Sequence, residues 1–340
     1  MSHSQESKIR GAVLGLAFGD AMSFPASTHR LRLLNIKRSN RMIGLTQFAF
    51  DEKQNTYPTV YTHAQSVEFL APRPTDDSEW LYFSADIHLS SLEPKDGWLK
   101  LANAGEDLRG RTGTLMALDN LKSGKMPPHS GHDNPHYFDD MAMVRSLSAA
   151  LIFKGNHELV LEKVRCDAEV THSEDGIYCA LAFAAVVSSL LADEDIETAI
   201  AKSLKHLPRG SWSDQVISDA LKATAKAKTV TEAAYILEEV VIDRIYSYSI
   251  SAPESLALVL SYLRVAKTAN DFLLAGTINK RKLDSMPALL GAIAGLIHGD
   301  DWVPEGFKEN SSTLDGVCIP SLKGSSLSEL AQRIISYKSA

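Results

Sequence analysis

The chain has 340 residues, with 35 Lys and Arg against 42 Asp and Glu, so its formal net charge is −7. Binding to a phosphate backbone needs a positive surface, so this balance excludes nucleic acid as the main partner. With 44% hydrophobic and 23% charged residues, the composition is that of a globular protein with a sizeable core. The longest apolar stretches fall short of the roughly 20 residues that a membrane span requires, so no membrane partner is expected.

The three cysteines are Cys166, Cys179 and Cys318. They are widely spaced and form no CxxC or Cys/His pattern, so neither a redox pair nor a zinc site is expected. The first residues lack the basic region, apolar core and small-residue cleavage site of a signal peptide. These features predict a cytoplasmic location in a reducing compartment.

The predicted elements are helices almost throughout. In the first third of the chain we expect helices over residues 8–18, 78–92 and 113–123. From residue 141 onward, apolar residues recur at i, i+3, i+4 and i+7, which is typical of amphipathic helices. This pattern predicts helices over residues 141–155, 158–170, 174–192, 194–206, 212–226, 230–241, 252–267 and 284–298.

Short breaks with Gly, Pro or capping residues separate these helices. Strand-like alternation is nearly absent, and no fixed-period repeat is found. The fold class is therefore all-α, a compact multi-helix bundle, and we expect a single domain over residues 1–340. Residues 26–74 and 124–139 are expected to be long loops at the rim of a site.

Two helices carry glycine at every fourth position. The first has Gly at 11, 15 and 19 and runs into Asp20; the second has Gly at 291, 295 and 299 and follows Asp284 and Ser285. Small residues four apart let another helix approach closely. Packed against each other, these two helices would bring acids from distant parts of the chain together.

A third motif is the stretch 75–79, Thr-Asp-Asp-Ser-Glu. Its hard oxygen atoms suit Mg²⁺, Ca²⁺ or Mn²⁺. The same residues are also good helix N-caps, because their side-chain oxygens accept hydrogen bonds from free backbone N–H groups. Taken alone, this motif favours capping.

In this order, the motifs resemble the ADP-ribosylglycohydrolase family, which includes the dinitrogenase-reductase-activating glycohydrolase. Residues 11–25 resemble its opening glycine-rich helix, 75–79 its TDDTE metal motif and 291–299 its last core helix. Further matching elements are Arg111 to Thr114, Gly124 to Pro128, Met143 to Arg145, Thr171 to Ser173, and Pro253 with Glu254. The resemblance covers nearly the whole chain and favours metal ligation over capping for Asp76 and Asp77.

The resemblance implies an ADP-ribosylglycohydrolase-like bundle with a metal cleft. It implies a hydrolase that cleaves the glycosidic bond of an N- or O-linked ADP-ribosyl group from a protein or small-molecule acceptor, with one or two Mg²⁺ ions as cofactor. The partner is then ADP-ribose or an ADP-ribosylated substrate. The implied metal ligands are Thr75, Asp76, Asp77, Asp284 and Ser285, of which Asp76 and Asp77 are also catalytic. The candidate substrate-binding residues are Asp20, Asn134, Tyr137, Phe138, Asp140 and His172.

Two departures from the family pattern suggest an alternative. Lys282 stands where the last motif has its first acid, and a protonated ammonium cannot ligate a metal. Lys282 is expected either to occupy that site as a built-in cation or to extend toward solvent. Asp139 and Asp140 would repel a diphosphate unless they cap the helix that starts near Met141. The alternative function is a metal-impaired, non-catalytic member that binds ADP-ribose or an ADP-ribosylated partner.

Overall fold

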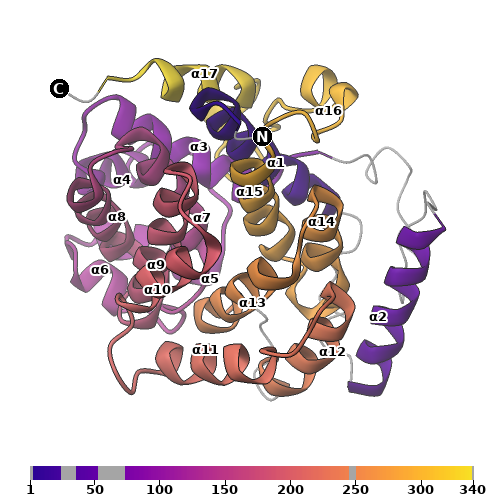
Figure 1. The fold of residues 1–340 in the computed structure, drawn as a ribbon. Coiled ribbons are helices and arrows are strands. Elements are labelled where there is room, and N and C mark those ends of the chain that lie inside the picture. Colours follow the sequence, from indigo (N-terminus) through magenta and orange to yellow (C-terminus); the bar gives the residue numbers. More distant parts are fainter. Residues whose placement is uncertain (1–2, 24–35, 53–72, 245–249, 339–340) are drawn as a thin grey trace.

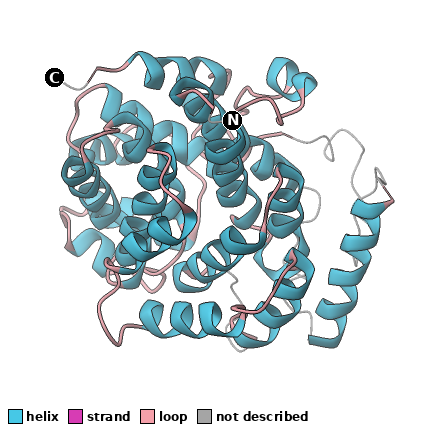
Figure 2. Cartoon of the chain, in the orientation of Figure 1, coloured by secondary structure: helices cyan, strands magenta, loops and turns pink. Residues whose placement is uncertain are grey.

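The computed structural model describes residues 3–23, 36–52, 73–244 and 250–338, which are mostly helical (Figure 2). Within these ranges no β-strand forms, and the only β-type pairings are isolated bridges between Asp139 and Ser251 and between Thr313 and Ser326. The predicted all-α class is confirmed. No helix in the same ranges is both long and apolar enough to cross a membrane.

The two glycine-bearing helices, α1 (Gln5–Ser23) and α15 (Met286–His298), pack side by side (Figure 1). They run antiparallel, because Gly11 meets Gly295 whereas Gly15 meets Gly291. A Cβ atom on any of these glycines would overlap the backbone of the other helix. Contact this close is possible only without side chains, and it confirms the expected packing of the two helices.

A second set of helices continues the core away from this pair. Helix α3 (Asp76–Leu89) packs against α7 (Met141–Ile152), and α7 packs against α9 (Asp175–Leu191). All twelve residues of α7 are buried, as expected for a helix surrounded by others. In the order of the chain, α3, α7 and α15 each begin at a motif singled out in the sequence.

The remaining helices cover these elements. They are α2 (Ile36–Asp51), α4 (Pro94–Ala102), α5 (Thr112–Lys122), α6 (His129–His132), α8 (His157–Thr171), α10 (Ile196–Leu204), α11 (Trp212–Ala223), α12 (Val230–Val240), α13 (Ala252–Val265), α14 (Ala269–Ile278), α16 (Glu305–Asn310) and α17 (Leu327–Ser336), with the 3₁₀ turns η3 (Lys280–Lys282) and η4 (Pro320–Leu322).

Several of these helices were not predicted. Helix α2 lies in the stretch 26–74 that was expected to be a loop, and it packs against α12 and α14. After Ile36 its first turns are polar and basic, so contacts with other helices support it more than its own periodicity does. Helix α14 packs against α15, α2 and α12, so apolar residues lie on several of its sides. Its sequence therefore lacks a clear amphipathic pattern. The rest of that stretch, residues 26–35 and 53–72, lies outside the described residues.

A buried histidine, His88 in α3, makes the fold sensitive to acid. Neither of its ring nitrogens has a hydrogen-bond partner among the described residues. Burial lowers the pKa of His88 from 6.5 to about 4. Between these pH values the unfolded chain binds a proton that the folded chain does not bind, so stability falls as the pH drops from 6.5 to 4.

Replacing His88 by leucine is therefore expected to remove this loss. The gap between 6.5 and about 4 corresponds to about 3 kcal/mol at ~1.36 kcal/mol per pKa unit. Urea unfolding at pH 7 and at pH 4 measures the difference for wild type and variant. His129→Leu, at an exposed histidine, should keep the wild-type dependence. An unchanged pH dependence in His88→Leu would contradict the prediction.

Candidate functional site

The carboxylate of Asp20, at the end of α1, lies against the first turn of α3. Its Oδ2 accepts hydrogen bonds from the backbone N–H groups of Thr75 (2.7 Å) and Ser78 (3.1 Å) and from the Ser78 hydroxyl (2.6 Å). The Thr75 hydroxyl donates to the other oxygen of Asp20. Thr75, the residue before α3, makes no side-chain cap of its own. Asp20, a predicted substrate-binding residue, thus caps α3 and orients the Thr75–Ser78 motif.

The acid that ends this motif, Glu79, has a structural partner. Its buried carboxylate accepts hydrogen bonds from the backbone N–H groups of Val317 (2.6 Å), Cys318 (2.7 Å) and Ile319 (2.9 Å). Three charge-assisted hydrogen bonds from consecutive residues hold the segment before α17 against α3. Glu79 therefore fixes the position of α3 and lies apart from the chemistry of the site.

The guanidinium of Arg111 lies where the carboxylates of the site converge. Arg111 precedes α5, and its side chain is only 8% exposed. Its nitrogens lie no more than 3.9 Å from carboxylate oxygens of Asp76, Asp77, Asp139, Asp140 and Asp284. These five aspartates and Arg111 are called the acid cluster below. The aspartates come from α3, from the segment before α7 and from the segment before α15.

Ser285 completes the cluster. Its hydroxyl accepts a hydrogen bond from Nη2 of Arg111 and lies 3.0 Å from Oδ1 of Asp140, to which it donates. Asp140 also receives hydrogen bonds from Nη1 of Arg111 and from the Ser255 hydroxyl. In contrast, Oδ2 of Asp77 is buried and has no hydrogen-bond partner among the described residues. The structure thus brings all the predicted metal ligands to one place, since Thr75 adjoins Asp76.

Burial and mutual repulsion shift the proton equilibria of these acids. Burial raises the pKa of Asp76 from 3.8 to about 7, and the charge of Asp284 adds to the effect. Burial and the neighbouring Asp76 also raise the pKa of Asp77 well above its ordinary value. Burial alone would lower the pKa of Arg111, but the surrounding aspartates outweigh it and raise that pKa further. Arg111 is therefore a permanent cation beside Asp76 and Asp77, the two acids whose ionisation burial makes unfavourable.

A chain of buried hydrogen bonds leads from Arg145 of α7, through the end of α8, to this cluster. Arg145 Nη2 donates to the Thr171 hydroxyl (2.7 Å), and that hydroxyl lies 2.6 Å from Nδ1 of His172. The Thr171 hydroxyl and Nδ1 of His172 therefore share a hydrogen bond. Nε2 lies 2.9 Å from Oδ1 of Asp139. His172, predicted to line the substrate pocket, thus holds Asp139 in place.

Of Asp139 and Asp140, which were expected to cap the helix that starts near Met141, only Asp139 does so with its side chain. Its Oδ1 accepts a hydrogen bond from the backbone N–H of Met141 (2.9 Å), whereas Asp140 makes no side-chain cap. Burial would raise the pKa of Asp139, but His172, Arg111 and the Met141 N–H group outweigh it and lower the pKa to about 2. Capping therefore accounts for one of the two acids, and both face Arg111.

The segment before Asp139 is anchored at Asn134 and carries two aromatic residues, Tyr137 and Phe138. Asn134 is buried; its amide donates to the carbonyls of Gly131 (2.8 Å) and Thr171 (3.0 Å), so it anchors the segment. Phe138 is half-buried and contacts Tyr137 at 5.4 Å and the exposed Trp212 at 5.4 Å between ring centroids. Of the predicted substrate residues, Tyr137 and Phe138 form an aromatic group with Trp212, whereas the amide of Asn134 is bonded to backbone carbonyls.

Lys282 follows neither of the two expectations stated above. It is buried, with an exposure of 1%, and so does not extend to solvent. Its Nζ lies 3.6 Å from Oε2 of Glu254 and donates to the Ser251 carbonyl at 3.5 Å. Because a buried ammonium needs a counter-ion, Glu254 draws Lys282 away from Asp284. The cation of the acid cluster is Arg111 instead.

The arrangement does not fit a divalent metal. Carboxylates and hydroxyls are the ligands that Mg²⁺ takes, but here they converge on a guanidinium. A metal bound to Asp77, Asp284 and Ser285 would lie beside the positive charge of Arg111, which already contacts all three. In the part of the chain that the structure describes, no group of three or more His, Cys, Asp or Glu side chains is arranged to hold a metal ion.

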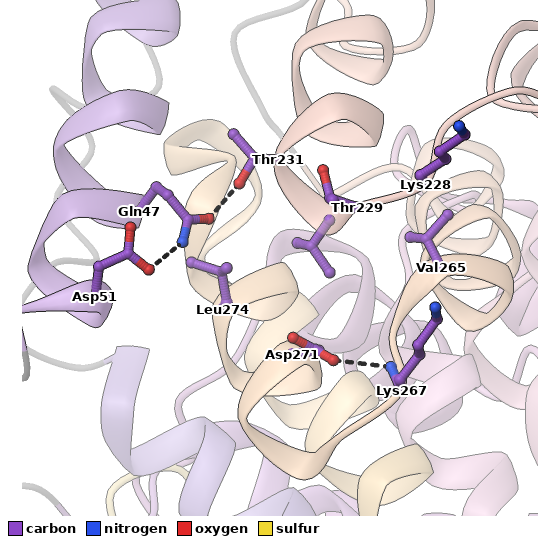
Figure 3. A pocket seen from close by; sticks show the side chains of 10 residues that line it. Gln47, Asp51, Lys228, Thr229, Thr231, Val265, Lys267, Asp271 and Leu274 are labelled. Atoms are coloured by element: carbon purple, nitrogen blue, oxygen red, sulfur yellow. Dashed lines mark hydrogen bonds between the residues drawn. The ribbon is translucent and has the colours of Figure 1, made fainter.

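A separate pocket of about 560 Å³ lies among α2, α12 and α14 (Figure 3). Gln47 Nε2 donates to Asp51 (2.7 Å), and the Thr231 hydroxyl donates to the amide oxygen of Gln47. None of the predicted site residues lines this pocket. It is therefore distinct from the acid cluster.

Sequence reasoning did not single out Arg111 and Asp139 as members of the site. Arg111 belongs to a segment matched to the family, whereas Asp139 lies where the sequence departs from the family pattern, and neither carries a local pattern that marks it for this role. The signal that could have found Arg111 is charge balance. Several buried acids in one place require a compensating cation, so a basic residue of the matched segments was to be expected among them.

Comparisons with known proteins identify the family and the fold of the chain. A model described as ADP-ribosylglycohydrolase matches residues 1–339, so the chain belongs to the ADP-ribosylglycohydrolase family. Among solved structures it is similar to an "ADP-ribosylglycohydrolase-related protein complex", with 19% sequence identity, a TM-score of 0.62 and 97% of each chain covered. At this identity the likeness shows the fold. A comparison with curated proteins finds no match.

Proposed function

We propose that this protein binds an ADP-ribosyl group, free or attached to a partner, without the metal-dependent hydrolysis expected of its family. The family supports the class of ligand. The observation that carries the proposal is the Arg111 guanidinium, which takes the position among Asp77, Asp284 and Ser285 that a metal would need. Without a metal, no ion lowers the pKa of an attacking water.

Two parts of the site suit the parts of such a ligand. Asp76 and Asp284 are the exposed members of the acid cluster, with side-chain exposures of 28% and 19%. Their oxygens would accept hydrogen bonds from ribose hydroxyls, which are good donors to carboxylates. Tyr137, Phe138 and Trp212 would stack an adenine ring. The diphosphate would then lie away from the carboxylates.

A second candidate is metal-dependent hydrolysis of the same group. It is favoured by one observation: Asp76, Asp77, Asp284 and Ser285 are all present and converge on a single cation. This candidate requires Arg111 to leave the acid cluster. The two candidates therefore differ in whether Mg²⁺ is needed.

Calorimetric titration of ADP-ribose separates them. We expect binding in the presence of a chelator, unchanged by Mg²⁺, together with no release of ADP-ribose from an ADP-ribosylated protein. Phe138→Ala should weaken binding about tenfold, since stacking of one base is worth ~1–3 kcal/mol. Tyr235→Ala, at an exposed tyrosine of α12, is the matched control. Mg²⁺-dependent turnover would favour the second candidate, and no binding under either condition would contradict both.

A further inference from the structure

We infer that Arg111 closes a latent divalent-metal site, so that the acid cluster takes up a metal ion only when the guanidinium is removed. The inference deepens the proposed function and rests on it for the absence of metal-dependent turnover. In this inference, the guanidinium of Arg111 balances the charge of the acid cluster and thereby excludes a divalent metal ion.

The contacts of Arg111 resemble those of a bound ion. Nη2 lies 3.4 Å from Asp284, 3.6 Å from Asp77 and within hydrogen-bond distance of Ser285. Nη1 faces Asp140 and lies 3.7 Å from Asp139. These separations exceed the ~2.0–2.1 Å of a Mg²⁺–oxygen bond, as a larger guanidinium requires. One side chain thus contacts both Asp76 and Asp284, two acids that are 208 residues apart in the sequence.

Two carboxylate oxygens of the acid cluster accept no hydrogen bond from Arg111. Oδ2 of Asp77 and Oδ2 of Asp139 are buried without a hydrogen-bond partner among the described residues, and both side chains have an exposure of 0%. A buried carboxylate oxygen without a donor is unfavourable, so each would gain from a closer cation. This observation is independent of the contacts of Arg111 and points to a cation as the missing partner.

Among the described residues, Lys282 is not placed to replace Arg111 if the guanidinium is removed. Lys282, the closest basic residue in the sequence to Asp284, is engaged by Glu254 and by the Ser251 carbonyl. Loss of the guanidinium would leave the cluster strongly negative at its centre. Such a cluster either takes up protons or binds a divalent ion, and hard oxygen ligands favour the ion.

Manganese binding tests the inference directly. Mn²⁺ is titrated into the wild type, Arg111→Ala, Arg111→Gln and Arg111→Lys, and free Mn²⁺ is followed by electron paramagnetic resonance. We expect the alanine and glutamine variants to bind Mn²⁺ about tenfold or more tightly than the wild type. Their melting temperature should also rise with added Mg²⁺, because an ion that binds only the folded state stabilises it.

Two controls isolate the role of the guanidinium. Arg111→Lys retains a positive charge and should bind Mn²⁺ no better than the wild type. Arg109→Ala removes a nearby arginine whose side chain is 71% exposed, and it too should match the wild type. Glutamine keeps polar atoms in the cluster, so it covers the case in which the alanine variant does not fold.

Three outcomes would overturn the inference. They are wild-type Mn²⁺ binding as tight as that of the variants, folded alanine and glutamine variants that bind no metal, and failure of both variants to fold even with millimolar Mg²⁺. None of these measurements contains ADP-ribose. The latent metal site and the proposed binding of an ADP-ribosyl group therefore succeed or fail separately.

Discussion

Replacing Gly295 by alanine is expected to lower the free energy of unfolding by about 4 kcal/mol. The added Cβ atom would overlap the carbonyl group of Gly11 on the facing helix. Backbone atoms cannot rotate away as a side chain can, so α1 and α15 would have to separate along their contact. Overpacking in a core usually costs about 1–3 kcal/mol, and a contact with backbone lies above that range.

Urea denaturation followed by circular dichroism measures this loss. The matched control is Gly306→Ala in α16, where an added Cβ atom has nothing within 4 Å. That substitution should change stability by less than about 1 kcal/mol. If both substitutions have similar effects, the contact between α1 and α15 is not the cause of the loss.

Replacing Arg145 by methionine is expected to destabilise the protein by about 3–5 kcal/mol. Arg145 is fully buried; its Nε donates to Asp167 at 2.7 Å, and its guanidinium lies 4.9 Å from the centre of the Trp98 ring. Within the described part of the chain, its loss leaves the carboxylate of Asp167 with the hydrogen bond from Trp98 Nε1 alone. The Thr171 hydroxyl also loses a donor, which weakens the support of His172.

Equilibrium unfolding of two further variants checks the cause. Arg165→Met removes an arginine that is 51% exposed and lies 3.9 Å from Glu169, so it should change stability by less than about 1 kcal/mol. Arg145→Met combined with Asp167→Leu should recover part of the loss, because the unpaired charge is removed as well. A double variant that is as unstable as the sum of the single ones would contradict this explanation.

The sequence predicted the parts of the fold that depend on local pattern. The helical class followed from periodicity, and the contact of α1 with α15 followed from glycines four residues apart. Asp284 lies just before α15, and Asp20 at the end of α1 accepts hydrogen bonds from the first turn of α3, so the contact of α1 with α15 helps to bring Asp76 near Asp284. Helices such as α2, whose support comes from neighbouring helices, were missed for the opposite reason.

The occupant of the acid cluster was beyond the reach of sequence reasoning. Lys282 was the obvious basic residue beside the last motif, yet Glu254 holds it elsewhere. Arg111 precedes a helix in a segment without acids next to it, and only the folded chain brings it among them. Which cation fills a buried acidic site depends on the reach and direction of long side chains, and these are properties of packing.

The contact between α1 and α15 has a consequence for the synthesis of the chain. Gly15 meets Gly291 and Glu79 binds the backbone of Val317 to Ile319, so elements near the start of the chain need partners near its end. At roughly 5–20 residues per second, α15 leaves the ribosome roughly 15–60 s after α1. During that interval the glycine face of α1 has no native partner. The acid cluster therefore assembles only after the segment that carries Asp284 has been synthesised.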